Sequence, residues 1–255
     1  MNFSFEYGFC LGLVGLYLFD SAKLISYNQL FLVCGLRSQF SSDLPPKHHQ
    51  ILKKYVYFTR PLHGASLVFL MQWKLQKYVL TTTSATLKYD LETIKNIQKN
   101  LRKLQISSGL VWLLTLIIFP FLFIIQQNSI FVLILLMCIY TINLIHILLI
   151  YLQRNTLQIT KIQCLHYLID ALFCPPFALN LLKKICLNYK IKSDAITLAT
   201  QLLSKNEFQH FAIQLISEIE QLKISETDIH SSHFIHLQQL QDHLKKQIGM
   251  CTLSS

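Results

Sequence analysis

The sequence is short of charged residues, and the shortage is concentrated in one place. Asp, Glu, Lys and Arg make up 14% of the 255 residues, against roughly 25% in an ordinary soluble domain. Between Lys103 and Arg154 there is none of them. Because a soluble fold has little use for so long an uncharged stretch, this composition favours an integral membrane protein.

Motifs that bind nucleotides, metals or redox cofactors are also lacking. Glycine and proline are scarce, and no glycine-rich phosphate loop or His-Glu-x-x-His motif is present. The seven cysteines are too far apart for a Cys-x-x-Cys site, and their odd number is a poor disulfide framework. The net charge of +10 lies in segments that flank apolar runs, without a nucleic-acid-binding motif, so we expect no nucleic acid as a partner.

Two long apolar runs predict a transmembrane helical hairpin at residues 107–152. Residues 107–125 and 130–152 are each long enough, at about 1.5 Å per residue, to cross a hydrocarbon layer of about 30 Å. The polar residues 126–129 form a short turn, so the helices must be antiparallel neighbours. Pro120 removes one backbone donor and predicts a kink.

A third span is predicted at the N-terminus, from about Phe3 to Ile25. The run is short unless Asp20 and Lys23 reach the headgroup layer. A cleaved signal peptide is the alternative, but the run lacks a basic segment before it and a small-residue cleavage site after it. Three glycines, Gly8, Gly12 and Gly15, recur on one face and favour close helix packing, although glycine is also common in membrane helices generally.

The distribution of Lys and Arg predicts the orientation. All twenty-three follow the first helix or flank the hairpin: Lys23, twelve from Arg37 to Lys103, and ten from Arg154 onward. Since cytoplasmic segments accumulate these residues, the N-terminus and the hairpin turn should lie outside and both large segments inside. A fourth apolar stretch, 164–182, would place four lysines outside. We therefore expect two short interfacial helices there, broken at Cys174-Pro175-Pro176.

The predicted fold is an α-helical integral membrane protein with three transmembrane helices, a small β-rich cytoplasmic segment and a helical C-terminal region. Short β-prone runs at 28–35, 54–60, 65–73 and 77–83 predict an antiparallel meander. Apolar residues from Leu87 to Leu104, spaced three or four apart with basic residues between them, predict an amphipathic helix that runs into the second span. The divisions are an anchor at 1–26, the β-rich segment at 27–86, the basic helix at 87–106, the hairpin at 107–152, interfacial helices at 153–192 and a helical region at 193–255.

Two groups of polar residues are candidate sites. The histidines His230, His233 and His236, at spacings of three, would lie near one helix face and could ligate a divalent transition metal. The outer pair diverge around the helix, however, which favours exposed histidines near a helix start over a metal site. In the third span, Tyr140, Asn143 and His146 should face another helix, either for interhelical hydrogen bonds to Thr115 or Ser108 or as a ligand or proton site. No other cofactor is expected.

The functional hypotheses follow from this organisation. The first is a non-enzymatic multi-pass protein of the cell membrane, a scaffold, assembly factor or regulator whose cytoplasmic segments meet a protein partner or a second copy. The second is a membrane-associated metal-dependent protein or enzyme that uses the histidine cluster. The third is a subunit of a transport assembly.

Overall fold

The chain is mostly helical, with two small antiparallel sheets. The computed structural model describes residues 5–26, 28–35, 39–43, 50–51, 54–58, 66–73, 84–125, 129–189, 191–225 and 231–253. The helices are α1 (Phe5–Ser21), α2 (Ser84–Leu113), the π-helical turn η3 (Leu114–Ile118), α3 (Phe119–Ile125), α4 (Ser129–Leu152), α5 (Lys161–Phe173), α6 (Pro175–Ala178), α7 (Leu181–Leu187), α8 (Ala195–Leu202), α9 (Lys205–Ser225) and α10 (Ser232–Leu253). The strands are β1 (Ala22–Ile25), β2 (Gln29–Cys34), β3 (Phe40–Asp43), β4 (Gln50–Ile51), β5 (Lys54–Phe58) and β6 (Leu67–Gln72).

Two helices are long and apolar enough to cross a membrane. One is the continuous helix Ser84–Ile125, which contains α2, η3 and α3, and the other is Ile130–Leu152 in α4. Only 22% and 28% of their most apolar windows are buried inside the protein, whereas the core helix of a soluble protein would be mostly buried. The turn η3 lies directly before Pro120, where the missing proline N–H interrupts the regular helical hydrogen bonds.

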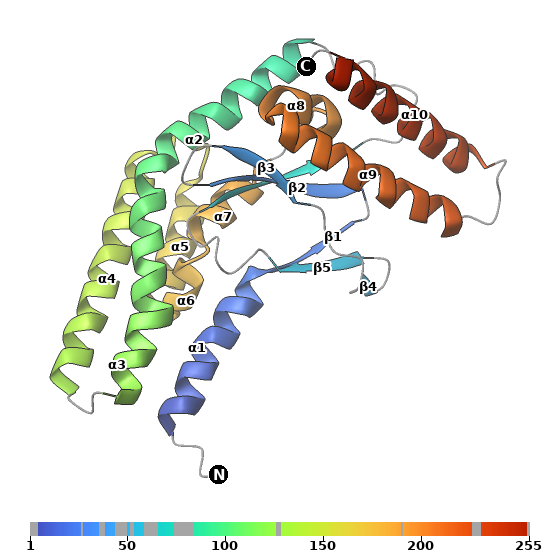
Figure 1. Cartoon of the computed structure of the whole chain (residues 1–255). Coiled ribbons are helices and arrows are strands. Elements are labelled where there is room, and N and C mark those ends of the chain that lie inside the picture. The colour runs from blue at the N-terminus through green and yellow to red at the C-terminus, as the bar shows by residue number, and fades with distance from the viewer. Residues whose placement is uncertain are drawn as a thin grey trace.

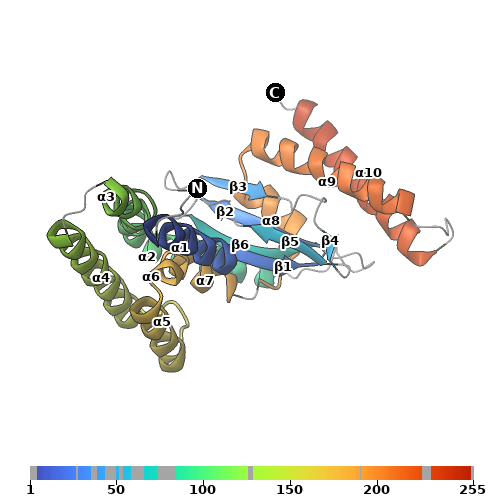
Figure 2. The same ribbon diagram turned by 90° about the horizontal axis from the view of Figure 1, so that it is seen from below.

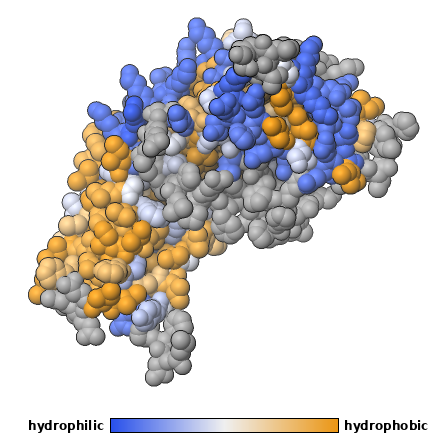
Figure 3. All heavy atoms as spheres, in the orientation of Figure 1, coloured by the Kyte–Doolittle hydropathy of each residue, from blue (hydrophilic) through white to orange (hydrophobic). Residues whose placement is uncertain are grey.

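Hydrophobic surface gathers at one end of the molecule. In the view of Figure 3, apolar side chains cover the end built by α3 and α4, and hydrophilic side chains cover the opposite end. Exposed apolar residues at this end include Leu110, Ile117, Phe121, Leu133, Met137 and Leu148. So large an apolar surface is typical of a face that meets lipid or another protein.

The strands form two sheets, and the predicted single meander is wrong. The sheet orders are β1-β5-β4 and β3-β2-β6. Strand β2 pairs with β6, Leu32 opposite Phe69, although β4 and β5 lie between them in the chain. Nearly every residue of β2 and β6 is buried, so each strand needs cover on both faces and they pair in the centre of the core. The predicted strand at 77–83 lies outside the described residues.

The first half of α2 covers one face of the β3-β2-β6 sheet. Its apolar residues Ile94, Ile97, Leu101 and Leu104 are at most 3% exposed and share a core with strand residues such as Phe69. The predicted amphipathic helix therefore uses its apolar face for the protein core. Most apolar residues of α7, such as Leu182 and Ile185, belong to this same core, and Leu187 at its end packs with Phe31, Val33 and Val68 on the opposite face of the sheet.

The N-terminal helix is shorter than predicted. It ends at Ser21, and Ala22–Ile25 is strand β1, paired with β5. The pairing supplies the backbone hydrogen bonds that a longer helix would have made. Figure 1 shows α1 beside the hairpin, and ring contacts of Phe9 with Phe119 and Phe123 fix it against α3.

The segment after α4 contains three short helices where two were expected. Residue Thr160 starts α5 with a capping box to Gln163. Helix α5 ends at Phe173, and Pro175 starts α6 after the break at Cys174. An exposed apolar face remains on α5, made by Ile162, Leu165, Ile169, Leu172 and Phe173.

The C-terminal helices pack on the other side of the molecule from the hairpin. Asp194 caps α8 by accepting from the backbone N–H of Ile196 and Thr197. Helices α9 and α10 lie side by side in both views (Figures 1 and 2). Their buried residues Phe211, Leu215 and Leu237 belong to the same core as the sheet.

Asp90 joins α2 to the segment that precedes α8. Its carboxylate accepts hydrogen bonds from the backbone N–H of Lys192 at 3.0 Å and of Ser193 at 2.8 Å. It is 1% exposed. We expect Asp90→Ala to lower the free energy of unfolding by roughly 2–4 kcal/mol, since two buried donors lose a charged acceptor. The measurement is unfolding in detergent followed by the fluorescence of buried Trp73.

The matched control for Asp90→Ala is Glu92→Ala, because Glu92 is exposed on the same helix. It should change stability by no more than about 0.5 kcal/mol. Equal effects of the two substitutions would contradict the role given to Asp90.

Candidate functional site

A buried polar cluster forms where the end of α1 meets α7. At its centre is Asn180, 2% exposed. The amide nitrogen of Asn180 donates to Asp20 and to Ser21, each at 3.0 Å, and its amide oxygen accepts from Lys183 at 3.1 Å. The ammonium group of Lys183 also lies 3.4 Å from the hydroxyl of Tyr17. One amide thus joins two segments about 160 residues apart in the sequence.

Two ion pairs extend the cluster toward α5. The ammonium of Lys184 lies 3.0 Å from the carboxylate of Asp20 and 3.2 Å from that of Asp170. The cluster therefore contains two carboxylates and two ammonium groups, and their formal charges sum to zero. Its geometry clamps α1, α5 and α7 together.

Burial in the cluster shifts the pKa of Lys183. It is 2% exposed, and burial lowers its pKa to about 8, against an opposing effect of nearby Asp20. Sequence reasoning missed this cluster, since it treated Asp20 and the lysines as headgroup contacts in separate segments. The one available signal was the presence of Asp20 and Asp170 within otherwise apolar stretches.

The polar residues predicted in the third span lie on α4. His146 and Asn143 are buried at 8% and 2% exposure, and Tyr140 is half-buried. The Nε2 atom of His146 lies 2.5 Å from the hydroxyl oxygen of Ser107 on α2. The partner is thus next to the Ser108 that was expected. The amide nitrogen of Asn143 has no hydrogen-bond partner among the described residues.

The glycine strip on α1 is exposed. A Cβ atom placed at Gly8, Gly12 or Gly15 would meet no described heavy atom within 4 Å. A packing role for these glycines stays a prediction.

The histidine cluster is only partly described. His230 lies outside the described residues, the side chain of His233 is not described, and His236 lies half-buried on α10. No group of three potential metal ligands occurs among the residues that the structure does describe. The predicted metal site therefore stays a prediction.

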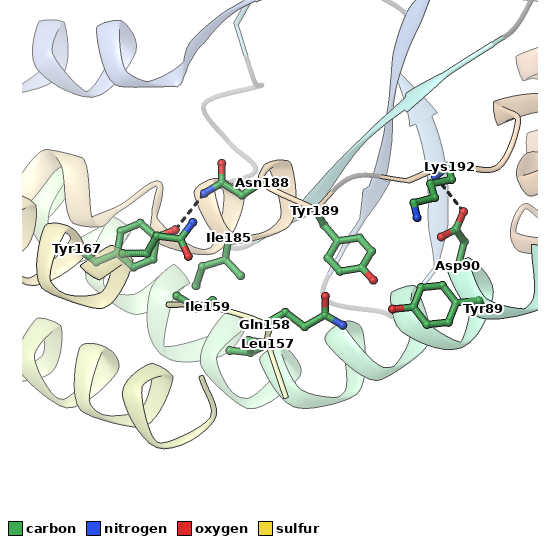
Figure 4. A pocket seen from close by; sticks show the side chains of 11 residues that line it. Tyr89, Asp90, Leu157, Gln158, Ile159, Tyr167, Ile185, Asn188, Tyr189 and Lys192 are labelled. Carbon is green, nitrogen blue, oxygen red and sulfur yellow. Dashed lines mark hydrogen bonds between the residues drawn. The ribbon is translucent and has the colours of Figure 1, made fainter. Parts of the chain in front are cut away.

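A pocket of about 250 Å³ lies between the first half of α2 and the segments that follow α4 (Figure 4). Its walls come from four segments: Tyr89 and Asp90 on α2; Leu157, Gln158 and Ile159 in the link after α4; Gln163 and Tyr167 on α5; and Ile185, Asn188, Tyr189 and Lys192 at and beyond the end of α7. Apolar residues of the core form part of the lining. Sequence reasoning did not single out any of these residues.

Hydrogen bonds order the polar lining of the pocket. Asn188 donates its amide to the hydroxyl of Tyr167 at 3.2 Å. Hydrogen bonds with Gln158 and Tyr189 lower the pKa of Tyr89, and burial raises the pKa of Tyr189. Gln158 has a φ of 55°, the one positive φ of a non-glycine residue in the described parts of the chain. This left-handed residue caps the helical turn after α4, since the N–H of Ile159 donates to the carbonyl of Arg154 at 2.9 Å.

Comparisons with known proteins found no match: no protein-family model, no curated protein and no solved structure is similar to this chain.

The lowered pKa of Lys183 predicts a pH-dependent stability. Because the pKa is about 8 when folded and about 10.4 when unfolded, burial of the charged form costs stability below pH 8. This cost disappears as the pH rises from 8 to 10.4. The free energy of unfolding of the native protein should therefore rise relative to Lys183→Met over this range, by up to about 3 kcal/mol.

The measurement is the difference in unfolding between wild type and Lys183→Met at pH 7.5 and pH 10. Taking the difference removes the titration of other groups. A gap that stays constant with pH would show that Lys183 is not desolvated as described.

Proposed function

We propose that this protein is a multi-pass scaffold or regulator of the cell membrane, which presents a folded cytoplasmic region to a protein partner. A single observation carries the proposal: the helix from Ser84 to Ile125 is unbroken. Its first half packs in the core with the sheet, and its second half presents exposed apolar side chains. A rigid connection of this kind holds a cytoplasmic region at a fixed place on the membrane.

Helix α1 is the third span in this proposal. Its 17 residues correspond to about 25 Å at 1.5 Å per residue, a little short of the hydrocarbon thickness. Its contacts support the assignment, since Phe9 packs against α3 and the polar cluster meets its other end. In this proposal the cluster lies at the cytoplasmic headgroup layer, at the end of the crossing, and its charged groups are neutralised by one another.

The distribution of basic residues supports a cytoplasmic location of the sheet and the C-terminal helices. Exposed Lys99 and Arg102 on α2 lie just before the apolar half of that helix, and Arg154 follows the end of α4 over the ring of Tyr151. Basic and aromatic residues at such positions are typical of the cytoplasmic interface. The exposed apolar face of α5 would lie against the same lipid layer.

Helices α9 and α10 are the proposed surface for the partner. They pack on the far side of the core from the hairpin (Figure 1), and they expose isolated isoleucines, Ile213, Ile224 and Ile235. Apolar side chains within a charged surface supply burial energy to a partner, about 1.5–3 kcal/mol each.

Photo-crosslinking in intact membranes tests the proposal. A photoreactive residue at Ile213 should give a polypeptide adduct of defined mass, because the partner covers this face. The same residue at Leu133, exposed on α4, is the matched control and should give lipid adducts. An adduct of twice the chain mass would identify a second copy as the partner. Absence of polypeptide adducts from Ile213, Ile224 and Ile235 alike would contradict the proposal.

A further inference from the structure

We infer that the pocket between α2 and the segment after α4 binds a neutral, hydroxyl-rich ring about the size of a monosaccharide. The inference goes beyond the proposed function, because it does not depend on a protein partner. It rests on the size of the pocket, the balance of its charges and the kind of groups that line it (Figure 4).

The volume limits the ligand to a single ring. The pocket holds about 250 Å³, and the pockets of drug-sized ligands hold about 300–1,000 Å³. At about 30 Å³ for each water molecule in the liquid, roughly eight waters would fill it. A six-membered ring with its hydroxyl groups displaces a comparable volume.

The charges in the lining favour a neutral ligand. Lys192 and Asp90 are the charged residues of the lining, and their formal charges cancel. The Asp90 carboxylate already accepts two backbone N–H groups, so it is a poor partner for a cation. The start of α5 adds only a partial positive charge. An ionic ligand would therefore lose hydration without a compensating net charge.

The uncharged lining suits hydroxyl groups. Three tyrosines, two glutamines and one asparagine line the pocket. Phenols and amides can each donate and accept hydrogen bonds, as hydroxyls do. They can therefore pair with both the O–H donor and the oxygen acceptor of a ligand hydroxyl. In Figure 4 the amide of Gln158 lies near the hydroxyl groups of Tyr89 and Tyr189. Aromatic rings also offer flat apolar faces to the C–H edges of a sugar ring.

The backbone fixes where the Gln158 amide lies. Gln158 caps the helical turn after α4 with a left-handed φ of 55°, because the N–H of Ile159 donates to the carbonyl of Arg154 at 2.9 Å and that of Gln158 to the carbonyl of Asn155 at 3.3 Å. This cap holds the side chain of Gln158 in the lining of the pocket. The link that carries Gln158 begins one residue after α4 ends, while Tyr89 lies on the helix that becomes the other arm of the hairpin. A bound ring would therefore connect the cytoplasmic ends of both arms.

The test measures ligand binding by the full chain in a polyoxyethylene detergent, which carries no sugar or phosphate headgroup. The probes are D-glucose and myo-inositol, observed by saturation-transfer NMR, and inorganic phosphate, observed by its phosphorus line width. We expect saturation transfer to the ring protons of at least one of the two neutral probes, and no broadening by phosphate.

Two variants make the test specific. Gln158→Gly relieves the positive φ and removes the amide, so it should raise the unfolding temperature and weaken binding at least tenfold. Tyr189→Phe should weaken binding with little change in unfolding. The control Tyr151→Phe, on α4 outside the pocket, should leave binding unchanged.

Three outcomes would overturn the inference. Binding of phosphate without either neutral probe would make the pocket an anion site. Equal binding by wild type and Gln158→Gly would place the probe elsewhere on the protein. Absence of saturation transfer from both neutral probes would show that the pocket does not take a hydroxyl-rich ring.

Discussion

The helix from Ser84 to Ile125 lies in the protein core along its first half and exposes apolar side chains along its second half. The other elements are arranged around it. Its first half buries Ile94, Ile97 and Leu101 against strands and neighbouring helices, each contributing roughly 1.5–3 kcal/mol. Its second half leaves apolar side chains exposed, and a helix is one of the few structures that satisfies its backbone groups without water. Because the helix is continuous, the core that contains the sheet and the helical hairpin are joined directly.

The polar cluster at the end of α1 makes a second connection between the same two regions. Buried ion pairs contribute little net stability against an apolar alternative, because desolvation offsets their attraction, but loss of one partner is strongly unfavourable. Asp20, Asn180 and Lys184 therefore specify where α1 sits more than they strengthen the fold. The cluster lies where the end of α1 meets α7, and the pocket lies beside the first half of α2.

Much of the helical framework could be predicted from the sequence. The uncharged stretch identified the hairpin, the spacing from Leu87 to Leu104 identified the amphipathic helix, and the proline pair identified the break after α5. These features are local, since periodicity and charge can be read within one segment. The assignment of three spans, the orientation and the metal ligation at His230, His233 and His236 stay predictions.

The errors and omissions arose where distant segments meet. The pairing of β2 with β6, the early end of α1 in a strand and the contact of Asn180 with Asp20 depend on tertiary packing, which a single sequence does not encode locally. The same is true of the pocket, whose lining comes from four segments. Gln158 could not be identified either, because nothing in its sequence context requires a positive φ.

The most direct test of the central claim is an accessibility scan with spin labels along the helix from Lys95 to Phe121 in lipid bilayers. Labels at exposed Lys99 and Arg102 should collide with a water-soluble relaxation agent, and labels at Leu113, Ile117 and Phe121 should collide with dissolved oxygen instead. We predict a single change of environment near Ile106, with α-helical periodicity up to Leu113 and a shift of phase only across the π-helical turn η3. Access of the water-soluble agent to Leu113, Ile117 and Phe121 would contradict it.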